Sequence, residues 1–158
     1  MTTTGRSEPL AHTEATFSLT LEAPMEVVTP LFGAERERVW ADDWDPEFVY
    51  PTPAADREGM VFTVAHDGAR SIWVNTRFDL DGGHVQYCYV LPSVMATRIT
   101  IRVSSEGRST RVDVTYERTA LRAEVNEHVR RLSDADRGYG SEWQEQIGGY
   151  LRRRAARS

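Results

Sequence analysis

The stretch from Met60 to Leu121 constrains the fold most, because it holds five segments in which apolar and polar residues alternate. Turn signals separate these segments: Asp67-Gly68, Asp81-Gly82-Gly83, Pro92-Ser93 and the residues around Gly107. Alternation with a period of two is typical of a half-buried strand, and connections this short join neighbouring antiparallel strands. The stretch therefore predicts an antiparallel meander of five strands.

Residue parity assigns the side chains to two faces of that sheet, since successive residues of a strand point in opposite directions. The face predicted to be buried carries Phe62, Val64, Ile72, Val74, Phe78, Val85, Tyr87, Tyr89, Ile99, Ile101, Val103, Val112, Val114 and Tyr116. The face predicted to be solvated carries Asn75, Arg77, Asp79, Gln86, Arg98, Thr100, Arg102, Arg111, Asp113 and Glu117. Trp73 falls with the solvated set, either as a surface aromatic residue or as part of a contact with another chain.

The residues before the meander predict one strand, two short helices and a further short strand. Residues 16–22 alternate strictly, so this strand has a buried side made of Phe17, Leu19 and Leu21. Helical spacing with interrupting prolines predicts short helices at about 24–33 and 34–40. The short strand is expected near 48–50.

The residues after the meander predict two helices. Apolar residues recur at helical spacing from 121 to 133, and glycines at 138 and 140 mark a break. A second helix follows, for which Ser141 and Gln144 form a candidate capping box. Its apolar stripe consists of Tyr139, Trp143, Ile147, Tyr150 and Leu151. The pair Gly148-Gly149 weakens this helix, either to admit a ligand or the sheet, or because the end tolerates it.

Composition excludes several classes of function. A chain of 158 residues with 40% hydrophobic residues fits one domain, for which we expect residues 15–158 after a disordered tail at 1–14. The net charge of −5 disfavours nucleic acid as a partner, and the absence of lysine excludes Schiff-base chemistry. Cys88 is the single cysteine, and no run suggests membrane insertion or a secretory signal, so we expect a cytoplasmic location.

The order of elements and several short motifs resemble a known superfamily. The motifs are Glu37-x-x-Trp40-x-x-x-Trp44-Asp45-Pro46, Gly59-x-Val61-Phe62, Ile72-Trp73-Val74-x-Thr76, Tyr89-x-x-Pro92, Val112-x-Val114-x-Tyr116 and Glu142-Trp143. Over about residues 15 to 155, the chain is similar to bacterial START/Bet v 1-like (SRPBCC) proteins of the polyketide cyclase and lipid-transport kind. This resemblance implies an α+β helix-grip fold, in which a seven-stranded antiparallel sheet curves around a long C-terminal helix.

The resemblance also implies an elongated cavity between sheet and helix, whose mouth lies near the two short helices. Inward parity adds three tyrosines that could orient a polar ligand group, although ordinary core tyrosines are the simpler interpretation. The expected ligand-binding residues are Trp40, Trp44, Phe62, Tyr87, Tyr89, Tyr116, Trp143 and Ile147. Three aspartates at 42, 43 and 45 lack the regular spacing of a calcium loop, so we expect no metal and no cofactor.

The sequence is compatible with three functions. The first is binding of a hydrophobic, ring-containing small molecule in the cavity. The second is a cyclase or dehydratase in which the cavity tyrosines act, together with an acid or base inside the cavity. The third is a protein-interaction domain, like the chaperone regulators of the superfamily, with Trp73 on a contact surface. The oligomeric state is expected to be a monomer or a homodimer.

Overall fold

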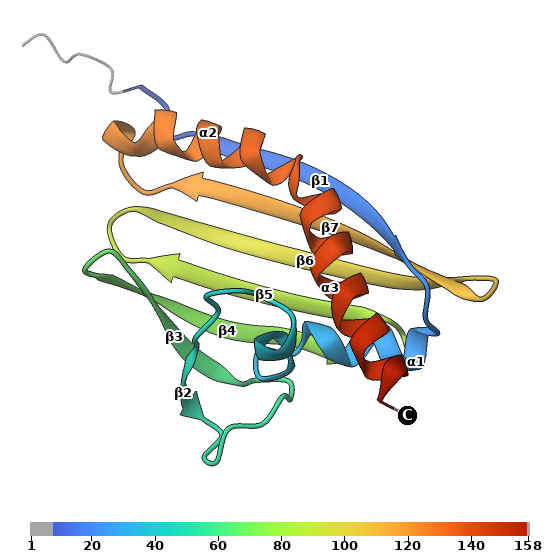
Figure 1. Ribbon diagram of the computed structural model, residues 1–158. Coiled ribbons are helices and arrows are strands. Elements are labelled where there is room, and N and C mark those ends of the chain that lie inside the picture. Colours follow the sequence, from blue (N-terminus) through green and yellow to red (C-terminus); the bar gives the residue numbers. More distant parts are fainter. Residues whose placement is uncertain (1–7, 158) are drawn as a thin grey trace, which may run out of the picture.

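The structure is a computed structural model that describes residues 8–157, and it contains one sheet with helices on one face (Figure 1). The strands in chain order are β1 His12–Leu21, β2 Glu47–Tyr50, β3 Val61–His66, β4 Ala69–Asp79, β5 His84–Leu91, β6 Met95–Glu106 and β7 Ser109–Ala120. The helices are α1 Met25–Val28, the 3₁₀ helices η1 Thr29–Phe32, η2 Arg36–Val39 and η3 Ala123–Val125, then α2 Asn126–Asp136 and α3 Tyr139–Ala156.

Within the described residues, the seven strands form one antiparallel sheet in the order β1-β7-β6-β5-β4-β3-β2. Strands 3 to 7 are consecutive neighbours, as the meander predicts, and β1 closes the sheet against β7. The helix-grip fold predicted from the sequence is therefore confirmed. Cross-strand pairing on the outer face also follows the prediction, because Arg98 lies opposite Glu117 and forms an ion pair with it at 2.6 Å.

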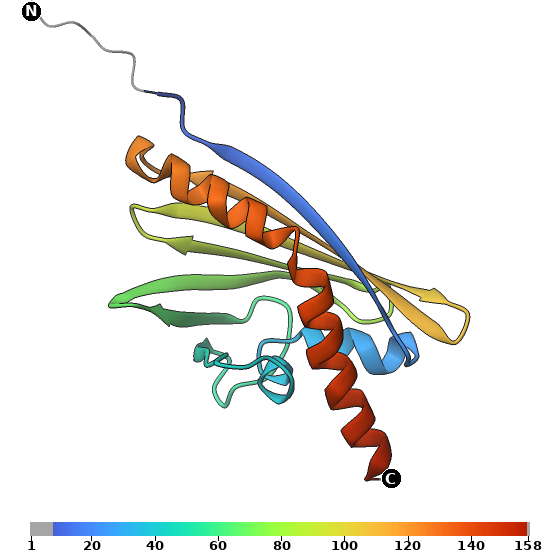
Figure 2. The ribbon, with the colours of Figure 1, turned by 45° about the horizontal axis from the view of Figure 1, so that its top comes forward.

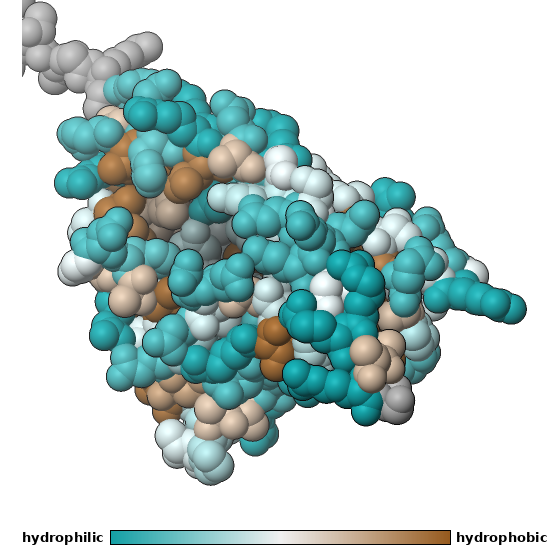
Figure 3. Space-filling view, in the orientation of Figure 1, coloured by the Kyte–Doolittle hydropathy of each residue, from teal (hydrophilic) through white to brown (hydrophobic). Residues whose placement is uncertain are grey.

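Two consecutive helices, α2 and α3, cover the concave face of the sheet. In Figures 1 and 2, α2 runs along β1 and β7, and α3 then turns away and crosses in front of the sheet, with its last turns extending beyond it. Neither these helices nor any other in the described part of the chain has the length and apolar character of a transmembrane span. The face shown in Figure 3 is mostly hydrophilic, and the surface recedes below α2.

The core lies between the sheet and these helices, and it is closed at one end by the first short helices. Phe17, Leu19 and Leu21 alternate along β1 and are all buried, as predicted. Buried side chains of α1 and η1 pack with them, and so do the inward residues of β5 to β7 and Ile147 of α3. Burying one such side chain is worth about 1.5–3 kcal/mol, so the helices are held chiefly by this packing.

The side chains of β4 do not lie on the faces that parity predicts. Trp73 and Asn75 point into the core with exposed fractions of 8% and 1%, whereas Ile72 and Val74 are 47% and 37% exposed on the outer face. The cause is an irregularity in the pairing of β4 with β5 between residues 75 and 77. One extra residue reverses the parity there, so Phe78 and Trp73 both lie on the core side and no single alternation fits the strand.

Three further expectations are corrected. Strand β1 begins at His12, so part of the predicted tail is in the sheet; residues 1–7 lie outside the described residues. The predicted capping box does not form, because α3 begins earlier and the Gln144 side chain accepts a hydrogen bond from the backbone of Thr20. The glycine that approaches the sheet is Gly140, where an added Cβ would lie 2.8 Å from the Ser18 carbonyl oxygen.

Candidate functional site

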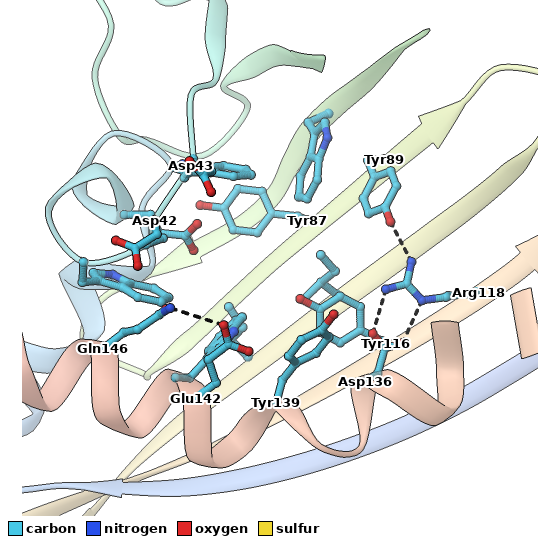
Figure 4. Close-up of a pocket in the computed structure, with 18 residues that line it drawn as sticks. Asp42, Asp43, Tyr87, Tyr89, Tyr116, Arg118, Asp136, Tyr139, Glu142 and Gln146 are labelled. Carbon is cyan, nitrogen blue, oxygen red and sulfur yellow. Dashed lines mark hydrogen bonds and ion pairs between the residues drawn. The ribbon is translucent and has the colours of Figure 1, made fainter. Parts of the chain in front are cut away.

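A pocket of about 350 Å³ lies between the sheet and the C-terminal helices (Figure 4). Its walls come from η2 and the loop after it, from the inward faces of β4 to β7, from the end of α2 and from the first turns of α3. The lining residues are Glu37, Trp40, Ala41, Asp42, Asp43, Trp44, Trp73, Tyr87, Tyr89, Ile99, Ile101, Tyr116, Arg118, Asp136, Tyr139, Glu142, Trp143 and Gln146.

Aromatic rings form one wall of this pocket across β4 and β5. Trp73 stacks on Tyr89 with ring centroids 4.3 Å apart, and Tyr87 meets Trp73 edge to face at 6.0 Å. Trp44 completes this wall from the loop after η2, with its ring 5.5 Å from that of Trp73. Each contact has one of the geometries that aromatic pairs favour, so the rings hold one another in place.

A second aromatic wall belongs to α3. Trp143 contacts Trp40 edge to face at 5.3 Å and Phe17 of β1 at 5.1 Å. Three of the four indole N–H groups donate to the protein itself: Trp40 to the Leu31 carbonyl, Trp44 to the Ala34 carbonyl and Trp73 to the Ser71 hydroxyl. These three rings therefore present π surface to the pocket, while their hydrogen-bonding capacity is already used.

The three tyrosines differ in what their hydroxyl groups do. Tyr87 donates to the Phe32 carbonyl at 2.6 Å, and Tyr89 accepts from the Arg118 guanidinium at 2.7 Å. The Tyr116 hydroxyl has no hydrogen-bond partner among residues 8–157. Burial raises the pKa of Tyr87 and of Tyr116, so both phenols are neutral at physiological pH. Of the three tyrosines predicted from the sequence, Tyr116 is thus the one whose hydroxyl is open to a ligand.

A buried ion pair lies at the end of the pocket nearest α2. The Arg118 guanidinium contacts both carboxylate oxygens of Asp136, at 2.7 and 2.8 Å, and its remaining nitrogen contacts Tyr89 (Figure 4). Both side chains are nearly fully buried. The guanidinium also lies 4.9 Å from the centre of the Tyr116 ring. This pair joins β7 to α2, the long helix that follows it after the short helix η3.

A carboxyl group without a partner lies at the other end. The Glu37 backbone is fixed, since its N–H donates to Gly33 and its carbonyl accepts from Trp40 and Ala41. Its side chain has no hydrogen bond and no ion pair among the described residues. Desolvation by burial raises the pKa of Glu37 well above its usual value, and the charge of Asp56 raises this pKa further. Proton uptake by Glu37 is therefore favoured.

Asp56 also sets the position of η2, which carries Glu37. Its two carboxylate oxygens accept from the backbone N–H groups of Glu35 and Arg36 at 2.8 and 3.0 Å, so the side chain caps the first turn. Gly33 is required here because an added Cβ would lie 2.2 Å from the Asp56 carboxylate. This segment is thus held by polar contacts that the sequence pattern does not reveal.

Six of the eight predicted site residues line the pocket: Trp40, Trp44, Tyr87, Tyr89, Tyr116 and Trp143. The other two do not. Phe62 and Ile147 are fully buried in the core, where Phe62 packs against the rings behind the pocket. Whether the six residues bind a ligand stays a prediction.

Sequence reasoning missed Trp73 and all the charged residues of the pocket. Trp73 was misplaced by the irregularity in β4, and its burial removes the feature that favoured a protein-contact surface. A signal for Arg118 was present, because the inward alternation of β7 continues through residues 112, 114 and 116 to 118. A buried arginine needs a counter-charge, but the sequence does not indicate which carboxylate supplies it.

The three aspartates of the loop at 42–45 have different surroundings. Asp45 pairs with Arg38 at 2.8 Å, whereas Asp42 and Asp43 line the pocket. Across residues 8–157, no three His, Cys, Asp or Glu side chains converge as a metal site requires. The expectation of a metal-independent protein stays a prediction.

Comparison with known proteins shows similarity at the level of structure. No family model and no curated protein matches the sequence. Among solved structures, CalU16 from Micromonospora echinospora aligns with a TM-score of 0.60 at 14% identity, covering 92% of this chain and 85% of that chain. Ara h 8.0201 aligns with a TM-score of 0.60 at 13% identity, covering 89% and 98%.

Norcoclaurine synthase from Thalictrum flavum, solved in complex with dopamine and hydroxybenzaldehyde, aligns with a TM-score of 0.58 at 13% identity, covering 78% of each chain. These comparisons agree with the helix-grip architecture of the START/Bet v 1-like superfamily that the motifs suggest. Because every identity is this low, the likeness establishes the fold and leaves function to the site itself.

Proposed function

We propose that this protein binds a hydrophobic, ring-containing small molecule in the pocket between its sheet and its C-terminal helices. The observation that carries the proposal is the aromatic lining, in which four tryptophans and four tyrosines surround about 350 Å³. Pockets of about 300–1,000 Å³ with apolar walls and a few polar groups are typical of small-molecule sites. A protein of the same fold, norcoclaurine synthase, has been solved with two ring compounds bound.

Ring compounds should be preferred over straight acyl chains. Offset or edge-to-face contact with an aromatic side chain is worth about 0.5–1.5 kcal/mol beyond the area it buries, and a methylene chain gains only the burial. The edge-to-face and stacked pairs among the side chains of the two walls support this preference, because they leave aromatic surface along the pocket.

A thermal-shift panel tests this proposal by comparing polycyclic phenols and flavonoids with fatty acids of matched carbon number. A ligand at a hundred times its dissociation constant adds about 2.7 kcal/mol of stability, which corresponds to a rise in Tm of about 5 to 10 °C for a domain of this size. Trp44→Leu should reduce the rise, and Tyr50→Leu, at an exposed tyrosine outside the pocket lining, should not. Larger shifts with fatty acids would refute the preference, and no shift with either set would refute the binding proposal.

A second candidate function is proton-transfer catalysis of the cyclase or dehydratase type, and Glu37 is the observation that favours it. A general acid or base needs a pKa near the working pH, and burial moves the Glu37 pKa in that direction. Its test is turnover of a bound ring compound: Glu37→Gln should abolish the reaction while a neutral ring ligand still binds. Unchanged turnover in this variant would exclude Glu37 as the catalytic group.

A further inference from the structure

The charges that line the pocket are strongly unbalanced. Five carboxyl groups and one guanidinium group face it. The guanidinium, Arg118, is already neutralised by the bidentate contact with Asp136. Four carboxyl groups therefore remain without a basic partner among the lining residues: Glu37, Asp42, Asp43 and Glu142.

These four groups occupy two depths. Asp42, Asp43 and Glu142 are exposed, and Figure 4 shows that Asp42 and Glu142 come from opposite walls, the loop after η2 and α3. Glu37 is less exposed, and three backbone hydrogen bonds fix the residue that carries it. An acidic mouth attracts cations by its field, and a fixed carboxyl group further in can form a directed contact with one.

The aromatic walls add a second, independent preference for positive charge. The faces of indole and phenol rings carry negative potential, so a cation within about 6 Å of a ring centre is attracted to it. The indole N–H groups of Trp40, Trp44 and Trp73 already donate to acceptors of the protein. The ring faces are therefore the surface that a ligand meets. The pocket already contains one such contact, between Arg118 and the Tyr116 ring.

We propose that the pocket selects a ring compound that bears a positively charged amine, and that Glu37 is the counter-ion of that amine. This inference rests on the proposed function and names its ligand class. A carboxylate ligand would meet four carboxyl groups that have no basic partner in the lining, and a neutral phenol could donate a hydrogen bond to Glu37 but would leave it without a counter-charge. An aromatic ammonium group satisfies Glu37 by charge and contacts the indole faces with the same atoms.

Isothermal titration calorimetry with three matched probes tests the ligand class: 2-naphthylethylamine, 2-naphthylethanol and 2-naphthylacetate, at pH 8 and fixed ionic strength. The amine should bind at least about tenfold more tightly than the alcohol, and the acetate more weakly than either, because two kinds of cation contact act together. If the alcohol binds as well as the amine or better, this inference fails while the proposed function stands. If no probe binds, ring binding itself fails.

Two variants test whether the preference for the amine depends on Glu37 itself or on the negative charge of the protein in general. Glu37→Gln should bring the amine-to-alcohol affinity ratio close to one while the affinity for the alcohol is kept. Glu145→Gln makes the same chemical change on α3 at an exposed residue outside the lining, and it should leave the ratio unchanged. Equal ratios in Glu37→Gln and in the parent protein would overturn the counter-ion assignment.

Proton release gives a readout that is independent of affinity. Burial and the charge of Asp56 raise the pKa of Glu37, so it holds a proton to higher pH than an ordinary glutamate, and Glu37 in turn contributes to the raised pKa of Tyr87 and of Tyr116. The other charged groups of the pocket are Asp42, Asp43, Glu142 and the Arg118–Asp136 pair.

Ammonium binding must displace a proton wherever Glu37 is protonated, so titrations from pH 5 to pH 8 in buffers of different ionisation enthalpy should show net proton release with the amine that declines as pH rises. This release should be absent in Glu37→Gln, and it should be absent with 2-naphthylethanol in the parent protein. Amine binding without proton release at any pH in this range, or release that persists in Glu37→Gln, would overturn the assignment.

Discussion

The two ends of the pocket hold their charged groups in opposite ways. At the α2 end, Arg118 and Asp136 satisfy each other, and Tyr89 takes the remaining guanidinium nitrogen. At the η2 end, Glu37 has neither an ion pair nor a hydrogen bond from its side chain among the described residues, and Asp56 adds like charge. The same cavity thus contains a completed polar network and an incomplete one.

This difference separates structural from functional chemistry. A buried charge that is fully paired contributes by joining elements, and breaking it leaves its partner uncompensated. A buried carboxyl group without a partner costs stability, and groups kept in spite of such a cost gather at functional sites. We therefore assign the Arg118–Asp136 pair to the architecture and Glu37 to the ligand.

The largest effect is expected from Asp136→Asn. This variant leaves the Arg118 guanidinium buried without a counter-charge, which costs about 3–5 kcal/mol. Urea denaturation measures the loss. The double variant Arg118→Met with Asp136→Leu should recover most of it, because apolar residues can replace a buried pair at little cost. No recovery in the double variant would show that the pair does more than neutralise charge.

The matched control for that variant is Glu117→Gln, which breaks the ion pair of Glu117 with Arg98 on the outer face of the sheet. Because the Arg98 side chain is about half exposed, the loss should be at most about 1 kcal/mol. Equal losses from the buried and the surface variant would refute the structural role given to the buried pair.

The next effect concerns the first turn of α3, where the helix approaches β1. Gly140→Ala should destabilise the protein by about 1–3 kcal/mol, because the new Cβ would lie 2.8 Å from the Ser18 carbonyl oxygen. Gly148→Ala, in the same helix, meets only the flexible end of the Arg152 side chain at 3.3 Å and should gain up to about 1 kcal/mol from helix propensity. Thermal unfolding of both variants checks the opposite signs.

The fold was predictable because its signals are local. Each strand of the meander shows its own alternation, and short turns leave few choices of partner, so the observed sheet order follows. Strand β4 was misassigned because an extra residue reverses parity inside it, and no sequence signal marks that position. A close approach to the sheet is one of the alternatives that the sequence leaves open for Gly148-Gly149, but the approach occurs at Gly140, since a sequence does not show which helical glycine faces the sheet.

Sequence patterns predict the aromatic residues of the site but not its charged residues, for a physical reason. Its aromatic residues lie on strands and helices with readable periods, or in a dense local cluster around Trp40 and Trp44. Its charged residues depend on contacts between different elements: Arg118 of β7 meets Asp136 of α2, and η2 is held by Asp56 from the loop after β2. Such pairings are set by tertiary packing, which no local pattern encodes.

The smallest effect should come from Glu37→Gln, and its sign is opposite to that of Asp136→Asn. The pKa of Glu37 is raised in the folded protein, so the folded state binds a proton more tightly than the unfolded state. Stability must then fall as pH rises from the ordinary pKa of glutamate, near 4.5, to the raised value, and stay at the lower level above it. Glutamine removes this loss because it cannot ionise.

The variant should therefore match the parent protein near pH 4 and exceed it at pH 8, and the difference should grow between these limits. Each kcal/mol recovered corresponds to a rise in Tm of about 2 to 4 °C for a domain of this size. The pKa of Asp56 is also raised, but both proteins contain Asp56, so this group by itself does not create the difference in stability between them. Melting curves of both proteins from pH 4 to pH 9 check the trend. A constant offset, or a variant that is less stable at pH 8, would show that Glu37 has a stabilising partner, and the contrast between the two ends of the pocket would then be lost.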